Sequence, residues 1–220
     1  MPIGCLSTLP NIIAHMHKLN PQQILDLGIG MGMYGVAIRQ WLDGGFNAVG
    51  YNPLAKYMSD THALTSYSDG YRRTIIGVEG FAGYQNPCWE LYNSVYKMPI
   101  QQYLALDTGL KFNAIIIADV IEHFEKPEGL QVLETLLHRL ADYGHLYVAT
   151  PAIFCEQGAV YANEFERHRS LWYKDDFELL ANRFAIDGVQ LAVLQDGQPD
   201  QFGNLMLTVA LSVGRALPGA

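Results

Sequence analysis

The most informative segment of the chain reads Asp26-Leu27-Gly28-Ile29-Gly30-Met31-Gly32. An apolar run at residues 24–27 is typical of a buried strand, and residues 33–42 carry apolar side chains at helical spacing. Glycines between a strand and a helix permit a tight turn and let a ligand approach the backbone closely. The segment therefore predicts a strand, a glycine-rich turn and a helix that together bind a ligand.

Strand and helix patterns alternate along the rest of the chain. Strands are predicted at residues 24–27, 74–78, 114–118, 146–149, 186–194 and 205–213, and helices at residues 10–18, 33–42, 87–96, 127–140 and 175–184. This alternation predicts an α/β fold with a mostly parallel sheet. A polar loop at residues 195–204 joins the last two strands, which are expected to form a C-terminal antiparallel hairpin.

Composition favours a single domain. The 220 residues are 50% hydrophobic and contain no repeat or linker-like tract, so residues 1–220 are expected to share one core. The least regular stretch, residues 44–73, is rich in Tyr, Ser and Asp. It predicts an insertion or cap over the binding site.

Charge and cysteine content argue against several classes of protein. The net charge of −8 argues against a nucleic-acid partner, because phosphate neutralisation requires clustered Lys and Arg. No apolar run reaches the roughly 18 residues of a membrane span, and the N-terminus lacks a secretory signal. Cys5, Cys88 and Cys155 are widely spaced. They predict reduced thiols, no metal site and a cytoplasmic location.

The glycine-rich turn admits two interpretations. An acidic residue followed by three glycines at alternate positions resembles the S-adenosylmethionine (SAM) signature of class I methyltransferases. Gly30, Gly32 and Gly35 also fit the dinucleotide fingerprint, which expects an acidic residue about 20 positions later. Asn52 stands near that position, and its amide lacks the charge of a strong acceptor.

Glu79 is the better candidate for the cofactor ribose. The segment Ile75-Ile76-Gly77-Val78-Glu79-Gly80-Phe81 is similar to the second-strand signature of the methyltransferases. The resemblance implies that the Glu79 carboxylate accepts hydrogen bonds from both ribose hydroxyls.

The segment after the third expected strand, at residues 114–118, strengthens the resemblance, because it is similar to the segment that follows the fourth strand of the family. Asp119-Val120-Ile121-Glu122-His123 looks like the segment in which an acid faces the methionine amino group and an apolar neighbour packs near the adenine. It departs from the Asp/Asn-Pro-Pro-aromatic motif of amino-methylating DNA enzymes. After Tyr96-Lys97-Met98, which corresponds to the third-strand position of the family, Ile100 and Gln101 stand where an Asp is usual. The resemblance thus implies a Rossmann-like class I fold and these cofactor-binding residues: Asp26, Gly28, Ile29, Gly30, Glu79, Gly80, Phe81, Ile100, Asp119 and Val120.

Two histidines are candidates for catalysis. His168 lies in a His-Arg-Ser-x-Trp segment that resembles one found after the fifth strand of some small methyltransferases, on the substrate side. Either His168 or His123 could serve as a general base or bind the substrate, because imidazole titrates near neutral pH. The alternatives are that His123 caps a helix start, and that His168 is a loop residue beside Ser170, which caps the last helix.

The expected function is transfer of a methyl group from SAM to a small-molecule, sugar or lipid-linked acceptor, with S-adenosylhomocysteine (SAH) as the second product. A site on a protein remains open as the acceptor. Two alternatives also remain: an NAD-dependent oxidoreductase that uses Gly30, Gly32 and Gly35, and a SAM-binding module without catalysis. The sequence leaves the acceptor atom and the oligomeric state undetermined.

Overall fold

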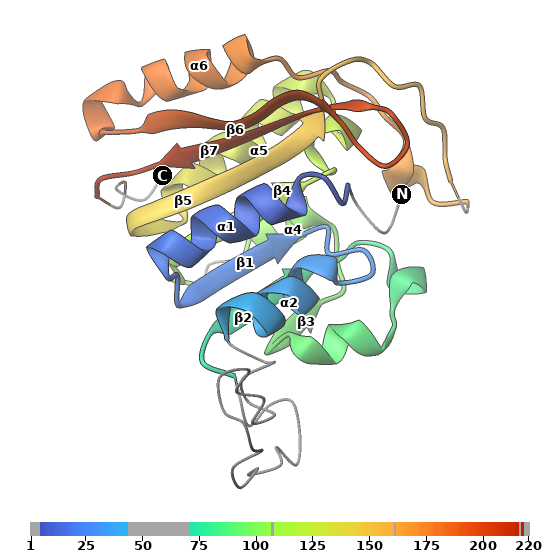
Figure 1. The fold of residues 1–220 in the computed structure, drawn as a ribbon, viewed down its shortest axis with the longest axis horizontal. Coiled ribbons are helices and arrows are strands. Elements are labelled where there is room, and N and C mark those ends of the chain that lie inside the picture. The colour runs from blue at the N-terminus through green and yellow to red at the C-terminus, as the bar shows by residue number, and fades with distance from the viewer. Residues whose placement is uncertain (1–4, 44–70, 107, 161, 216, 218–220) are drawn as a thin grey trace, which may run out of the picture.

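A seven-stranded sheet forms the centre of the computed structural model, which describes residues 5–43, 71–106, 108–160, 162–215 and 217 (Figure 1). The strands are β1 (Gln23–Leu27), β2 (Thr74–Val78), β3 (Ser94–Tyr96), β4 (Phe112–Ala118), β5 (Leu140–Pro151), β6 (Gln190–Pro199) and β7 (Leu205–Ser212). Their order is β3-β2-β1-β4-β5-β7-β6, and the pairs among β1 to β5 are all parallel. β7 runs antiparallel to both β5 and β6. The predicted α/β class, the mostly parallel sheet and the C-terminal hairpin are confirmed.

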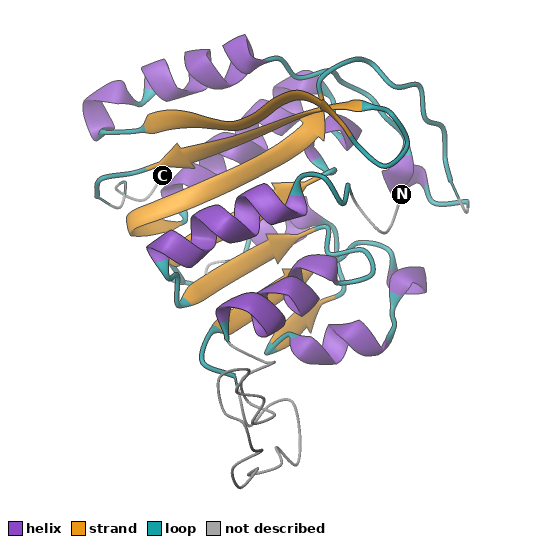
Figure 2. Cartoon of the chain, viewed as in Figure 1, coloured by secondary structure: helices purple, strands orange, loops and turns teal. Residues whose placement is uncertain are grey.

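Helices cover both faces of the sheet because strand side chains alternate between the faces. Ile24 of β1 packs with α1 (Leu9–Leu19), and α2 (Met33–Ala37) and the π-helical turn η1 (Ile38–Leu42) lie on the same face. Leu25 packs on the opposite face, which α4 (Ile100–Leu104), α5 (Lys126–His138) and α6 (Lys174–Arg183) cover (Figure 2). None of the helices in the described residues is both long and apolar enough to cross a membrane.

The predicted helix at residues 87–96 is wrong. Only Pro87–Leu91 is helical, as the 3-10 turn η4, and the chain then enters β3. Asn93 fixes this change, since its side chain accepts the Ile75 amide of β2 at 2.7 Å. β3 then pairs with β2, so pairing between strands overrides the helical spacing.

Other elements also differ from the sequence pattern: β5 begins at Leu140 rather than residue 146, and β6 extends to Pro199. The strand predicted at residues 186–194 begins only at Gln190, because Ala185–Asp187 forms the 3-10 turn η7 and Gly188 follows with a φ of +80°. The helix α4 was not predicted. Of the insertion predicted at residues 44–73, residues 44–70 lie outside the described residues.

A buried charge cluster connects the residues that precede this segment with those that follow it. Asp43 follows η1, and its carboxylate accepts from Arg39 at 2.6 Å and from Arg73 at 2.7 Å. All three side chains are buried, at 2–7% exposure. Arg73 also donates to the Pro21 carbonyl, so the cluster fixes the entry to β2 against the start of β1.

Candidate functional site

The turn after β1 has the backbone geometry that only glycine adopts readily. Gly28, Gly30 and Gly32 have φ values of +69°, +50° and +81°. A Cβ on Gly28 would lie 2.4 Å from Cγ2 of Val120, which follows β4. The glycines therefore let the β1 turn approach the end of β4 at the point where the strand order reverses, the usual ligand site of such sheets.

Glu79 ties the end of β2 to this turn. One carboxylate oxygen accepts the Gly30 N–H and the other accepts the Phe81 N–H, both at 2.8 Å. Burial raises the pKa of Glu79, and these two amide bonds oppose the rise. The predicted ribose acceptor is thus held in one orientation beside the glycine turn.

Asp26 has a different place from the other predicted cofactor residues. It lies beneath the turn, 2% exposed, and accepts the Tyr92 hydroxyl proton at 2.6 Å. Burial raises the pKa of Asp26 to about 7. Tyr92 in turn accepts the Gly35 N–H at 3.0 Å, and a Cβ on Gly35 would lie 2.4 Å from the Tyr92 ring. Asp26 therefore supports the first turn of α2 from below.

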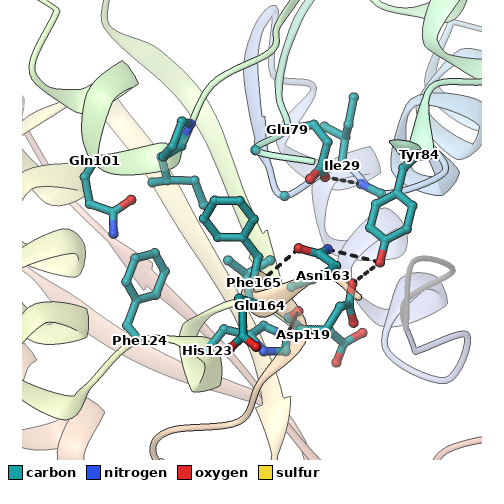
Figure 3. Close-up of a pocket in the computed structure, with 18 of the residues that line it drawn as sticks. Ile29, Glu79, Tyr84, Gln101, Asp119, His123, Phe124, Asn163, Glu164 and Phe165 are labelled. Carbon is teal, nitrogen blue, oxygen red and sulfur yellow. Dashed lines mark hydrogen bonds between the residues drawn. The ribbon is translucent and has the colours of Figure 1, made fainter. Parts of the chain in front are cut away.

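A cavity of about 340 Å³ opens beside the turn at the carboxyl ends of β1, β2 and β4. Eight of the ten predicted cofactor-binding residues line it: Gly28, Ile29, Gly30, Glu79, Gly80, Ile100, Asp119 and Val120. Asp26 and Phe81 are not among the residues that line it. Figure 3 shows Glu79 at one end of the cavity and Asp119 with His123 at the other.

The sequence did not predict the hydrogen-bonded side chains that form the wall of the cavity opposite α4. Tyr84 donates to Glu166 at 2.6 Å and accepts from Asn163 at 3.2 Å, and Phe165 lies between them and Gln101 (Figure 3). Asn163 to Glu166 belong to the loop between β5 and α6, directly before the His-Arg-Ser-x-Trp segment. Their position beside that segment could have marked them as site residues, although no sequence spacing relates them to Tyr84.

The cavity lining is strongly acidic. Among the described residues that line it are six carboxylates, together with the guanidinium of Arg169 and the imidazole of His123; the carboxylates are those of Glu79, Asp119, Glu125, Glu128, Glu164 and Glu166. Such a lining favours a ligand with positive charge and disfavours a polyanion.

The two segments that carry the candidate catalytic histidines, around His123 and His168, are joined by backbone hydrogen bonds. The Arg169 and Ser170 amides both donate to the Glu122 carbonyl of η5 (Ile121–His123), at 2.8 and 3.1 Å. Trp172 is fully buried, and its indole N–H donates to the Ile121 carbonyl and to Ser170. Ser170 therefore fixes Trp172, and the N-cap residue of α6 is instead Tyr173, whose backbone N–H donates to the Asp176 carboxylate at 2.7 Å.

His123 and His168 lie side by side as a result, with ring centroids 4.9 Å apart. His123 lines the main cavity, and both rings line a smaller cavity of about 70 Å³ next to it. Burial lowers the pKa of His123 to about 4 and lowers that of His168 as well. Both imidazoles are consequently neutral near pH 7.

Two acidic residues adjoin this pair. Glu122 is 3% exposed, and burial, with the nearby Asp119 charge, raises its pKa to about 8. Asp119 has a φ of +54° and accepts the Cys5 N–H, and burial raises its pKa to about 6. One donor atom each from Glu122, His123 and His168 lies within 4.8 Å of the others, a grouping that the sequence did not predict.

Known structures share this fold. The methyltransferase domain of bacterial CtHen1 is 19% identical, with 94% of this chain and 97% of that one covered and a TM-score of 0.54. Magnesium protoporphyrin IX methyltransferase from Synechocystis PCC 6803, with bound SAM, is 11% identical over 94% and 78% of the two chains, with a TM-score of 0.58. The plantazolicin methyltransferase BpumL in complex with SAH is 12% identical over 96% and 86%, with a TM-score of 0.57. No protein-family model and no curated protein matches the sequence. The chain therefore has the Rossmann-like fold of class I SAM-dependent methyltransferases.

Proposed function

We propose that this chain is a SAM-dependent methyltransferase that binds SAM in the 340 Å³ cavity. The observation that carries the proposal is the bond between Gly30 and Glu79, which joins the glycine turn and a ribose acceptor at the edge of one cavity. The cavity volume lies within the roughly 300–1,000 Å³ of small-molecule sites. The space beside Gly28, which a Cβ would fill, lets a ligand reach the backbone of the turn.

The residues present fit the chemical groups of SAM. Each Glu79 oxygen keeps a free lone pair for a ribose hydroxyl after its amide bond. Asp119 offers a half-buried carboxylate for the methionine ammonium group, and Val120 and Ile100 offer apolar surface for the adenine. SAM or SAH in the similar structures of the Synechocystis enzyme and BpumL supports this assignment.

The charge of the lining favours SAM over NAD. A dinucleotide brings a pyrophosphate with two negative charges, which the six carboxylates of the lining would repel. The sheet order also differs from the 3-2-1-4-5-6 order of dinucleotide-binding domains, because β7 enters between β5 and β6 in the reverse direction. Both observations count against the oxidoreductase interpretation.

The protein's part in the reaction is positioning and exclusion of water. When bound, SAM supplies an activated methyl group on a sulfonium, so the chain must mainly align the acceptor for in-line attack. Tyr84, Asn163 and Glu166 form a hydrogen-bonded wall that holds the loop after β5 over the cavity. His123 and His168 lie on the acceptor side, where a small-molecule, sugar or lipid-linked group would enter.

Calorimetric titration of the purified protein with SAH and, separately, with NAD tests the proposal. We expect stoichiometric SAH binding and no NAD binding at the same concentrations. NAD binding without SAH binding would refute the assignment. A screen of hydroxyl, amine and carboxylate acceptors with radiolabelled SAM then separates an enzyme from a SAM-binding module, which would bind SAH but transfer no label.

A further inference from the structure

A compact group of metal-binding side chains lies beside the cavity. Glu122 and His123 belong to η5, and His168 lies 45 residues later in the loop before α6. One donor atom from each lies within 4.8 Å of the other two. Donors about 2.0–2.2 Å from a shared ion are about 3–4.4 Å apart, so small side-chain adjustments would suffice. We propose that Glu122, His123 and His168 bind one divalent transition-metal ion.

His168 is already oriented as a metal ligand. Its Nδ1 lies 2.6 Å from the Cys155 carbonyl oxygen and must donate to it. In a neutral imidazole this bond leaves a lone pair on Nε2. A backbone carbonyl that accepts from the other ring nitrogen is the usual outer-shell partner of a metal-bound histidine. His123 has the Arg167 and Asp119 carbonyls near its two nitrogens, both at 3.2 Å, and the neutral ring donates to only one of them, so its other nitrogen keeps a lone pair.

Glu122 would supply the anionic ligand of such an ion. Its carboxylate is buried and receives a long hydrogen bond of 3.3 Å from Thr150. None of the ion pairs between described residues involves Glu122. A buried carboxylate without a cation is costly, whereas a metal ion would supply the missing charge.

The donor set points to a particular class of metal. Two imidazoles and one carboxylate suit Zn²⁺, Fe²⁺, Mn²⁺ or Co²⁺, whereas Mg²⁺ prefers oxygen ligands and retained water. Three protein ligands also leave at least one position open, as in metal sites that bind a substrate. The site therefore differs from a closed structural site.

The open position would face the acceptor. Glu122, His123 and His168 all line the 70 Å³ cavity, and His123 and Asp119 line the main cavity as well. This step rests on the proposed function: the ion would hold an acceptor hydroxyl oxygen and lower the pKa of its proton. The proton leaves to water as the oxygen–methyl bond forms, and the bonding pair of the broken carbon–sulfur bond stays on sulfur. The two histidines would then act as ligands, and the acceptor would be a hydroxyl.

Cobalt provides a direct test, because Co²⁺ bound to imidazole and carboxylate absorbs visible light. The chelator-treated full-length protein is titrated with CoCl₂, followed by competition with ZnCl₂, and binding is recorded by absorbance and calorimetry. The variants are Glu122→Gln and His168→Ala, with His145→Ala as the matched control. His145 pairs with His15 at the contact of α1 and β5, with ring centroids 5.4 Å apart, and is not part of the cluster.

We expect one Co²⁺ per chain, displaced by Zn²⁺. Both cluster variants should weaken binding by at least the ~10–100-fold that loss of an outer-shell partner causes, while His145→Ala binds normally. No stoichiometric binding, or equal binding by the cluster variants, would overturn the proposal. Titration of the same samples with SAH shows that each variant is folded and tests the proposed function separately. SAH binding without Co²⁺ binding defeats only the metal site, whereas Co²⁺ binding without SAH binding defeats only the methyltransferase assignment.

Discussion

Replacement of Glu79 provides a quantitative test of the cofactor site. Both carboxylate oxygens accept backbone amides at 2.8 Å, one from Gly30 and one from Phe81. In Glu79→Gln one oxygen becomes an NH₂ group, which must face one of these two N–H donors. An unsatisfied buried donor costs about 1–3 kcal/mol, so the glutamine variant should lose affinity even though its shape is unchanged. Glu79→Ala loses both acceptors and should lose more.

The expected magnitude follows from the bonds to the ribose. Loss of charge-assisted hydrogen bonds costs about 1.5–3 kcal/mol, which corresponds to a roughly 10–150-fold weaker affinity for SAH. Glu79→Gln should fall between the wild type and Glu79→Ala. Asn52→Ala, which removes the rival ribose partner suggested by the dinucleotide pattern, should bind SAH normally.

Calorimetric titration with SAH measures all three variants, and circular dichroism verifies that each is folded. If Glu79→Ala keeps the wild-type affinity, the ribose lies elsewhere and the reasoning fails. If Asn52→Ala loses more affinity than Glu79→Ala, the partner was misassigned and the dinucleotide interpretation regains support.

Two further predictions concern stability. Asp43→Ala leaves two buried arginines without their shared anion and should cost about 3–5 kcal/mol, which lowers the melting temperature by about 6–20 °C; a calorimetric melt unchanged from the wild type would contradict this. Burial raises the pKa of Asp26 to about 7 from an ordinary 3.8, with the Tyr92 hydroxyl opposing the rise and the Glu79 charge adding to it. The folded state therefore holds this proton more tightly, so the contribution of Asp26 to stability is complete below pH 3.8 and is lost as the pH rises through 7. Asp26→Asn keeps an acceptor for Tyr92, so urea unfolding at pH 5 and pH 8 should show less loss of stability in the variant than in the wild type, and equal losses would refute the shift.

The sequence by itself predicts the local features of the site. Glycines at alternate positions after a buried strand predict a turn with positive φ, because few other residues adopt that backbone, and Gly28, Gly30 and Gly32 adopt it. Alternating strands and helices predict a parallel sheet, and parallel strands place their carboxyl ends at one edge. For this reason Glu79 and Asp119, each at the end of a predicted strand, reach the same cavity.

The sequence did not show which face of the sheet each strand residue occupies, and only the folded sheet decided this. Asp26 belongs to the signature, yet it alternates with Leu25 and Leu27 and shares the α1 and α2 side with Ile24. It meets Tyr92 there and lies outside the cavity lining. Likewise β3 exists because Ser94 to Tyr96 pair with β2, a contact that no pattern within residues 87–96 contains.

Only the tertiary structure brought Glu122, His123 and His168 together. No metal-ligand spacing connects residues 45 positions apart, and the charge of Glu122 gave no sign that it would be buried. The three meet because the Arg169 and Ser170 amides bind the Glu122 carbonyl, and because Trp172 fills the space beside Gly129, where a Cβ would lie 2.6 Å from the indole ring. Backbone bonds and a buried indole are satisfied only once the sheet has formed, so the cluster is a product of packing rather than of local sequence.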